Sequence, residues 1–293
     1  MRFGITGASG FLGQELIRQA TVAGHQTVGF TRSRNQKVPG VTETQTFGPG
    51  MNVSGLKAVI HLAGESLFGL WTRSRRERIR RSRVEGTRWV VQAIERAVIR
   101  PAALISASGV GIYGDRGDDF LTDDAPASRY GFLADVSRAW EAEAVEARGL
   151  DVQVAPVRLG VVLGRRGALP LMATTFRTGL GGKLGSGKQW MPWIHIYDAA
   201  ALFLFLAEQG SVNAPVNGVA PEIVRNEEFT RKLARTLWRP AILPMPAFAL
   251  KGVLPEESTL LLNSARAVPE RALSAGFRFK FPELEPALRD LLR

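Results

Sequence analysis

The stretch that decides the fold is Gly7-Ala8-Ser9-Gly10-Phe11-Leu12-Gly13. It follows a strand-like segment, Arg2 to Thr6, and opens a segment, Phe11 to Ala23, whose apolar residues recur three and four positions apart. The first glycine permits a tight turn, the second lets the backbone approach a pyrophosphate, and the third lets the helix pack on the strand. Because the amino end of the helix then faces the anion, the stretch predicts a dinucleotide-binding turn. The alternative is a structural strand-to-helix turn that binds nothing.

Short apolar segments alternate with helical ones over the first half of the chain. Four more segments are predicted as strands, because they are rich in Val and Ile and too short for helices: Gln26 to Thr31, Lys57 to Ala63, Ala103 to Ala107 and Val152 to Arg158. Arg75 to Ala97 and Leu133 to Ala147 have helical periodicity. Such alternation requires right-handed crossovers and a parallel sheet covered on both faces. The predicted fold is therefore α/β, a Rossmann-type doubly wound parallel sheet.

The composition of the chain changes near Gly164. Five glycines lie between Gly179 and Gly187, and prolines separate short amphipathic pieces from Pro240 onward. A glycine-rich stretch is typical of a loop, and loops after the carboxyl ends of strands bind ligands in doubly wound folds. We expect a cofactor-binding domain over residues 1–163, whose sheet later residues can complete, substrate-side loops and helices over 164–239, and a small C-terminal cap over 240–293.

The overall composition is that of a folded globular protein, with 45% hydrophobic and 22% charged residues among 293. Cysteine is absent, which excludes disulfides, thiolate catalysis and Cys-ligated metals, and three His are too few for a His-rich site, so no metal is expected. The sequence has no signal-type segment and no apolar run of membrane-spanning length. We expect a cytoplasmic protein without a membrane partner.

The basic excess is concentrated in one segment. The chain has 38 Lys and Arg against 27 Asp and Glu, a net charge of +11, and Arg73 to Arg88 holds eight Arg and two Glu. Such a run is able to bind nucleic acid or anionic lipid. It lacks interleaved aromatic residues, so a solvated helix face is the favoured interpretation and a nucleic-acid partner is not expected.

The end of the second predicted strand distinguishes between two dinucleotides. NAD-binding folds place a carboxylate there for the ribose 2′-hydroxyl, whereas this chain has Phe30-Thr31-Arg32-Ser33-Arg34, without an acid. A guanidinium suits a 2′-phosphate because it is permanently charged and presents a fork of donors. The predicted cofactor is NADP(H), and the alternative is an exposed arginine without a ligand.

Several motifs together resemble one family. They are the spacing of the three glycines, His61-Leu62-Ala63-Gly64-Glu65, Ser106-Ala107-Ser108 followed by Tyr113-Gly114, Gly181-Gly182-x-x-Gly185-Ser186-Gly187, Trp193-Ile194-His195-Ile196-Tyr197-Asp198, and Ala275-Gly276-Phe277-x-Phe279-x-Phe281-Pro282. Over nearly its whole length the chain resembles the atypical extended short-chain dehydrogenase/reductases, in the NAD(P)-dependent epimerase family with a small C-terminal domain of unknown function. The resemblance implies a Rossmann domain, an NADP site, and a substrate cleft between that domain and the C-terminal part.

Carried over position by position, the resemblance implies a set of cofactor-binding residues. They are Gly7, Ser9, Gly10, Phe11, Leu12 and Gly13 at the pyrophosphate; Thr31 and Arg32 at the adenosine phosphate; Leu62, Ala63, Gly64 and Glu65 along the ribose and pyrophosphate; and Ser106, Ala107, Ser108, Pro156, Val157, Arg158 and Val162 beside the nicotinamide.

The arginine run contributes two further cofactor candidates. Family members commonly carry Asn-Val-x-Gly-Thr on the helix after the Ala-Gly strand, and the same frame here is Arg83-Val84-Glu85-Gly86-Thr87. Arg83 is therefore expected near the cofactor, and the alternative is a salt bridge with Glu65 or Glu85. Arg78 is a second candidate for the cofactor phosphates.

The Tyr-x-x-x-Lys pair that performs proton transfer in ordinary members is missing. Aligned on Glu141, the frame puts Leu133 at the Tyr position and Ser137 at the Lys position. Ser108 remains where a substrate oxygen is bound, and Tyr113 is a candidate acid that lacks a lysine partner. We expect an NADP(H)-dependent oxidoreductase or epimerase-like enzyme with an unknown small-molecule substrate. The competing hypothesis is a catalytically inactive NADPH-binding sensor or regulator.

The substrate-side candidates are Lys183, Lys188, Trp190 and His195. Gly182 to Lys188 matches part of a P-loop, but Gln189 replaces the hydroxyl that binds Mg²⁺ and the following residues cannot open a helix. Triphosphate binding is therefore rejected in favour of a loop that faces an anionic or aromatic ligand. His195 is a second candidate acid, against a structural role, and Asp198 is expected to N-cap the next helix.

Overall fold

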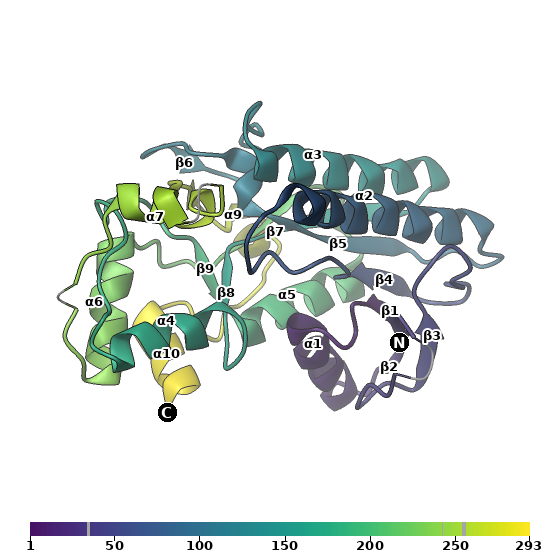
Figure 1. The fold of residues 1–293 in the computed structure, drawn as a ribbon. Coiled ribbons are helices and arrows are strands. Elements are labelled where there is room, and N and C mark those ends of the chain that lie inside the picture. Colours follow the sequence, from purple (N-terminus) through teal and green to yellow (C-terminus); the bar gives the residue numbers. More distant parts are fainter. Residues whose placement is uncertain (34–35, 242, 254–255) are drawn as a thin grey trace. The chain divides into compact units, whose positions relative to one another are not determined.

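The computed structural model describes residues 1–33, 36–241, 243–253 and 256–293, so Arg34 lies outside the described residues (Figure 1). The chain forms two compact units, each assembled from three segments. Unit 1 comprises Met1–Gly109, Asp135–Arg158 and Ala199–Val216, and unit 2 comprises Val110–Ala134, Leu159–Asp198 and Asn217–Arg293. The cofactor candidates belong to unit 1 with one exception, Val162.

Most of unit 1 is built on a seven-stranded sheet with the strand order β10-β7-β5-β4-β1-β2-β3, of which Leu159 and the last two residues of β10 are counted in unit 2. The strands are β1 (Arg2–Thr6), β2 (Gln26–Thr31), β3 (Glu43–Thr46), β4 (Ala58–His61), β5 (Ala103–Gly109), β7 (Gln153–Leu159) and β10 (Val216–Gly218). β1 pairs in parallel with β2 and β4, β2 with β3, and β4 with β5. The predicted α/β fold with a Rossmann-type parallel sheet is confirmed.

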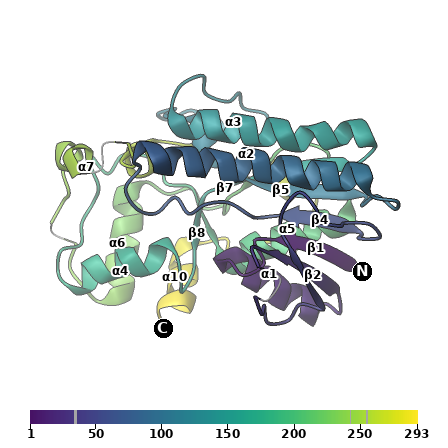
Figure 2. The same cartoon turned by 45° about the vertical axis from the view of Figure 1, so that its right-hand side comes forward.

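Helices cover both faces of this sheet (Figures 1 and 2). α2 (Arg73–Arg96) and α3 (Phe132–Val145), followed by the short η2 (Glu146–Leu150), lie side by side over one face, and Arg88 of α2 donates to Glu143 of α3. α1 (Phe11–Val22) and α5 (Ile196–Gln209) lie over the other face. Among the described residues, no helix combines the length and the apolar character needed to cross a membrane.

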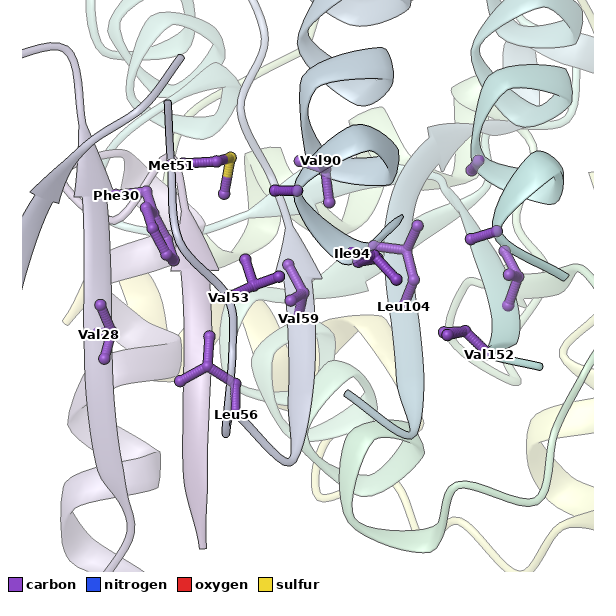
Figure 3. Close-up of a cluster of buried hydrophobic side chains, with 14 residues drawn as sticks. Val28, Phe30, Met51, Val53, Leu56, Val59, Val90, Ile94, Leu104 and Val152 are labelled. Atoms are coloured by element: carbon purple, nitrogen blue, oxygen red, sulfur yellow. The ribbon is translucent and has the colours of Figure 1, made fainter. Parts of the chain in front are cut away.

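The apolar side chains between the sheet and α2 determine which face of α2 is buried (Figure 3). Val59 and Leu104 of the strands pack in one cluster with Val90 and Ile94 of α2. Burial of each such side chain stabilises the fold by roughly 1.5–3 kcal/mol. Because helical residues three and four apart share a face, the same stripe of α2 continues back to Arg83, which is buried.

Unit 2 has separate apolar clusters of its own, and the larger one joins α4, α6 and α10. Its elements are η1 (Val110–Tyr113), β6 (Phe120–Leu121), β8 (Val161–Leu163), α4 (Ala168–Arg177), β9 (Trp193–His195), α6 (Asn226–Leu237), α7 (Ala247–Val253), α8 (Thr259–Leu262), β11 (Arg266–Ala267), α9 (Glu270–Ser274) and α10 (Leu284–Leu292). β8 pairs in parallel with β9, and β6 with β11. The glycine-rich stretch lies between α4 and β9.

Asp198 is not the N-cap that the sequence predicts. α5 begins at Ile196, so Asp198 lies in its first turn. The Asp198 carboxylate accepts hydrogen bonds from the backbone N–H groups of Lys280 and Phe281, both at 2.8 Å. Asp198 thus holds the C-terminal segment of unit 2 against the start of α5.

Candidate dinucleotide-binding site

The glycine turn after β1 is closed by its own backbone. The Gly10 N–H donates to the Gly7 carbonyl at 2.8 Å, and Gly7 has a φ of +67°. A Cβ atom at Gly13 would lie 2.3 Å from the Gly7 carbonyl oxygen. Only a residue without a Cβ therefore lets α1 pack this closely against the turn.

Among the described residues, no side chain caps the amino end of α1. Gly10 is the N-cap, and the first turn contains no acidic residue. Gly10 is exposed, and Phe11 and Leu12 are half-buried. Unpaired N–H groups and the helix dipole favour an anion at this position. The turn therefore fits the pyrophosphate of a dinucleotide.

The end of β2 presents an arginine to solvent. Thr31 is buried and its hydroxyl donates to the Ser33 carbonyl at 2.7 Å, while Arg32 is exposed. Within the described residues Arg32 forms no ion pair. Its guanidinium is therefore available to a phosphate beside β2, as the sequence predicts for NADP(H).

The end of β4 is joined to the glycine turn by the Thr6 side chain. The Thr6 hydroxyl oxygen accepts from the backbone N–H groups of Leu62 and Ala63, both at 3.1 Å, and lies 2.7 Å from His61 Nδ1. A Cβ atom at Gly7 would lie 3.0 Å from the Leu62 carbonyl oxygen. The two backbone segments that are predicted to border the pyrophosphate are thus in close contact.

Arg83 is a buried cation of α2 that lies beside the segment after β4. Its Nη1 donates to the carbonyl oxygens of Glu65 and Ile79 at 3.0 and 3.1 Å, and its guanidinium carbon lies 5.0 Å from the centre of the Trp140 ring. A Cβ atom at Gly64 would lie 3.4 Å from that carbon. Burial lowers the pKa of Arg83 to about 10, although the charge of Glu65 opposes the shift.

Neither the Glu65 nor the Glu85 carboxylate bonds to Arg83. Glu85 accepts from Arg81 at 2.8 Å, and a Glu65 carboxylate oxygen lies 3.7 Å from Arg75. Among the described residues, the hydrogen bonds of Arg83 go to carbonyl oxygens. Burying a guanidinium without a bonded carboxylate is costly, because no negative charge compensates its charge. A cofactor phosphate beside Gly64 would supply that negative charge. Arg78 is exposed on α2.

A second buried charge lies where β5 and β7 end. The Ser108 hydroxyl donates to Glu141 Oε1 at 2.6 Å, and Arg158 donates through Nε to Oε1 and through Nη2 to Oε2, both at 2.9 Å. Ser106 and Ala107 precede Ser108 on β5 and are buried, and Pro156 and Val157 precede Arg158 on β7 and are buried. Ser106 lies at the same end of the sheet as Thr6 and His61, because His61 pairs in register with both, and β7 is the next strand beyond β5.

Tyr113 is buried inside unit 2. Its hydroxyl donates to Asn217 Oδ1 at 2.7 Å and lies 3.2 Å from the Thr122 carbonyl oxygen. Asn217 in turn donates from Nδ2 to the carbonyl oxygens of Leu121 and Val268. Such an environment is typical of a structural tyrosine, and the catalytic role of Tyr113 stays a prediction.

The substrate-side candidates of unit 2 lie in different surroundings. Lys183 and Lys188 are exposed. Trp190 is half-buried and its indole nitrogen donates to Asp118 at 2.7 Å. The guanidinium carbon of Arg225 lies 4.5 Å from the centre of the Trp190 ring.

His195 is 3% exposed and its ring stacks on Phe281 with 3.9 Å between ring centres. Its Nδ1 accepts from the Tyr197 backbone N–H at 3.0 Å, and its Nε2 lies 3.3 Å from Asp290. These contacts are typical of a packed, structural side chain, and the substrate-side role of His195 stays a prediction. Val162 lies on β8 of the same unit and is half-buried.

The sequence does not predict the roles of two residues of this site. Glu141 bonds to both Ser108 and Arg158, and His61 bonds to Thr6 and Thr87. A polar residue at the end of an otherwise apolar strand, such as His61 after Ala-Val-Ile, is the signal that was available.

Two family models match the chain. The model of the NAD dependent epimerase/dehydratase family matches residues 4–217, and that of a domain of unknown function, DUF1731, matches residues 245–291. The epimerase family protein YfhF of Bacillus subtilis is 36% identical over all of this chain and 98% of its own length. A chloroplastic SDR39U1 homologue of Arabidopsis thaliana is 36% identical over all of this chain and 87% of its own length.

A solved structure gives the same result. The crystal structure of the human epimerase family protein SDR39U1 was determined with NADPH. Its sequence is 32% identical to that of this chain, the match covers 99% of each of the two chains, and the TM-score is 0.91. Its NADPH is in accord with the cofactor predicted from the end of β2. With a family model over most of the chain and relatives above 30% identity over nearly all of it, this protein belongs to the NAD dependent epimerase/dehydratase family, with a C-terminal DUF1731 domain.

Proposed function

We propose that this protein binds NADP(H) along the sheet edge of unit 1 and uses it to oxidise or reduce a small-molecule alcohol or carbonyl compound. When bound, the cofactor supplies a hydride acceptor or donor. The observation that carries the proposal is Arg83, a 9% exposed guanidinium that bonds to carbonyl oxygens and lies against Gly64. Keeping an arginine buried without a bonded carboxylate is costly unless an anion completes its partners.

The remaining residues of the edge have matching roles. The N–H groups at the start of α1 would bind the pyrophosphate, and Arg32 would bind the 2′-phosphate that separates NADP(H) from NAD(H). Arg83 would neutralise the pyrophosphate from the opposite side, with Glu65 holding the guanidinium in place through its carbonyl. Ser108 and Arg158 would border the nicotinamide, because their strands end at the same edge.

A binding assay tests the cofactor assignment. Isothermal titration should show tighter binding of NADPH than of NADH, and Arg32→Ala should remove most of the difference, a loss of about 10–100-fold for NADPH if the charge-assisted bonds contribute about 1.5–3 kcal/mol. Arg83→Met should weaken both dinucleotides. The matched control is Arg81→Met, an exposed residue of the same helix, which should leave both affinities unchanged. Equal affinity of the wild-type protein for NADH and NADPH would reject the assignment.

One observation favours a second candidate function. Leu133 and Ser137 stand where a tyrosine and a lysine would transfer the proton, which suits a protein that binds NADPH as a sensor or regulator. Hydride transfer across a panel of alcohols and carbonyl compounds distinguishes the two functions. Turnover of any member supports the enzyme, whereas tight NADPH binding with no turnover across the panel supports the sensor.

A further inference from the structure

Ser108, Glu141 and Arg158 form a hydrogen-bonded group in which the hydrogen between Ser108 and Glu141 can be assigned. An ionised Glu141 only accepts, and Arg158 only donates. The hydrogen in the 2.6 Å contact therefore belongs to Ser108 and points at Glu141 Oε1. The two lone pairs of the Ser108 oxygen remain as acceptor sites, so this hydroxyl can accept a hydrogen bond from a ligand without moving.

From this polarity we propose that Ser108 and Glu141 are the proton-accepting pair of an alcohol-oxidising reaction, in place of the missing tyrosine and lysine. The inference rests on the proposed NADP(H) site. The ligand group at Ser108 is then a hydroxyl, a hydrogen-bond donor, rather than a carbonyl. Glu141 acts at a position of α3 that is two helical turns beyond Leu133 and one beyond Ser137.

The reaction balances with the groups named. The alcohol loses its O–H proton to Ser108 Oγ while Ser108 passes its own proton to Glu141 Oε1, and the hydride of the alcohol carbon goes to NADP⁺. The alcohol is oxidised to a carbonyl and NADP⁺ is reduced. A weak base suffices in this direction, because the O–H bond of the alcohol becomes strongly acidic as the hydride leaves.

Arg158 has a positioning role in this scheme. Its two hydrogen bonds hold the carboxylate of Glu141 in one plane, with Oε1 toward Ser108, and its charge compensates the burial of that carboxylate. The side chains of Arg158 and Glu141 are 8% and 11% exposed. The position of Glu141 is therefore fixed before a substrate binds.

A binding measurement tests the placement without turnover. Glu141→Gln leaves the Arg158 charge uncompensated beside the nicotinamide, whose ring is positive in NADP⁺ and neutral in NADPH. The ratio of the Kd for NADP⁺ to that for NADPH should rise about fivefold, as expected for like charges at moderate distance in a partly wet site. Damage to the fold alone would weaken both forms equally, and an unchanged ratio would contradict the placement.

A turnover measurement tests the proton route. With NADP⁺ and a panel of alcohols, Glu141→Gln and Ser108→Ala should each lower kcat by about 100-fold or more, whereas Glu143→Gln, on the same helix and bonded to Arg88, should keep the wild-type rate. The double variant Glu141→Met with Arg158→Met should recover the wild-type Tm without recovering turnover, because an apolar pair replaces a buried ion pair.

A wild-type protein that binds no NADP⁺ would refute the proposed function itself. Two results would overturn only this inference. In the first, the wild type binds NADP⁺ but oxidises no alcohol of the panel. In the second, the Glu141→Gln variant oxidises alcohols as fast as the wild type does.

Discussion

The Nδ1 atom of His61 lies 2.7 Å from the hydroxyl oxygen of Thr6, and this contact fixes which ring nitrogen carries the proton. Thr6 already accepts two backbone N–H groups, so its own hydrogen goes to Nδ1. The proton of His61 is then on Nε2, which donates to the Thr87 hydroxyl at 3.0 Å, and Thr87 donates to the Arg83 carbonyl at 2.6 Å. One chain of hydrogen bonds thus connects the glycine turn to the backbone of the buried arginine.

A neutral His61 makes stability depend on pH in a defined window. Burial, and to a lesser degree the charge of Arg83, lowers the pKa of His61 from 6.5 to about 3. Between these values the unfolded chain binds a proton that the folded chain does not, so the free energy of unfolding falls as pH falls below 6.5. At pH 5 the loss should be about 2 kcal/mol, at 1.36 kcal/mol for each pH unit.

Urea unfolding at pH 7 and pH 5, for the wild type and for His61→Gln, measures this effect. The other titrating groups contribute equally to both proteins, so the difference between their two pH dependences isolates His61. The wild type should lose about 2 kcal/mol more than the variant. Parallel losses in the two proteins would show that His61 is not neutral at pH 5.

The extent to which the sequence predicts this fold varies with how local the signal is. β1, α1 and the turn between them follow from glycine spacing and apolar periodicity, both of which are properties of consecutive residues. β3 gives no such signal, because Glu43–Thr46 is Glu-Thr-Gln-Thr at the edge of the sheet. A strand of that kind forms because β2 offers it hydrogen-bonding partners, and not because its own side chains prefer it.

The candidate site follows the same rule. The glycine turn and Arg32 can be proposed as cofactor-binding residues from the sequence, since each proposal rests on one short segment. The pairing of Ser108 with Glu141 joins residues 33 positions apart, and the contact of Tyr113 with Asn217 joins residues 104 positions apart. A single sequence carries no periodicity for such pairs, so the polarity of Ser108 and the burial of Tyr113 become visible only in the folded chain.

Gly13 should tolerate no side chain. In Gly13→Ala the new Cβ would lie 2.3 Å from the Gly7 carbonyl oxygen and 3.0 Å from Ala8 Cα, both backbone atoms of the turn. Relieving the overlap requires α1 to move away from the turn, at a cost of about 1–3 kcal/mol. We expect a lower Tm and at least about a tenfold weaker binding of NADPH. Gly149→Ala, at a site with open space for a Cβ, is the matched control, and equal behaviour of the two variants would contradict the steric role.

Tyr113→Phe separates a structural from a catalytic role. The change removes the donor to Asn217 Oδ1 inside a fully buried network. Leaving that acceptor unpaired should lower the free energy of unfolding by about 1–3 kcal/mol, measured by denaturant titration. Turnover of the folded protein should be unchanged, because the hydroxyl acts within unit 2. A large loss of kcat with unchanged stability would instead return Tyr113 to the mechanism.

Arg75 should order the segment between β4 and α2. Its Nη2 donates to the carbonyl oxygens of Ser66 and Phe68 at 2.9 and 2.7 Å, which ties residues 66–68 to the first turn of the helix. Arg75→Met keeps most of the aliphatic stem and loses both bonds, each of which contributes about 1.5–3 kcal/mol when the donor is charged. Hydrogen exchange of the amides of residues 64–71 should therefore become faster, by about 10–100-fold if most of one bond's contribution is lost.

The matched control for Arg75→Met is Arg80→Met, which removes an exposed arginine from the same helix and should leave the exchange of residues 64–71 unchanged. Because Glu65 carries the carbonyl that bonds to Arg83, faster exchange in this segment should be accompanied by weaker NADPH binding in Arg75→Met but not in Arg80→Met. If exchange becomes faster while the affinity for NADPH stays the same, Arg83 is held without help from this segment, and its contact with the Ile79 carbonyl is then sufficient to position the guanidinium.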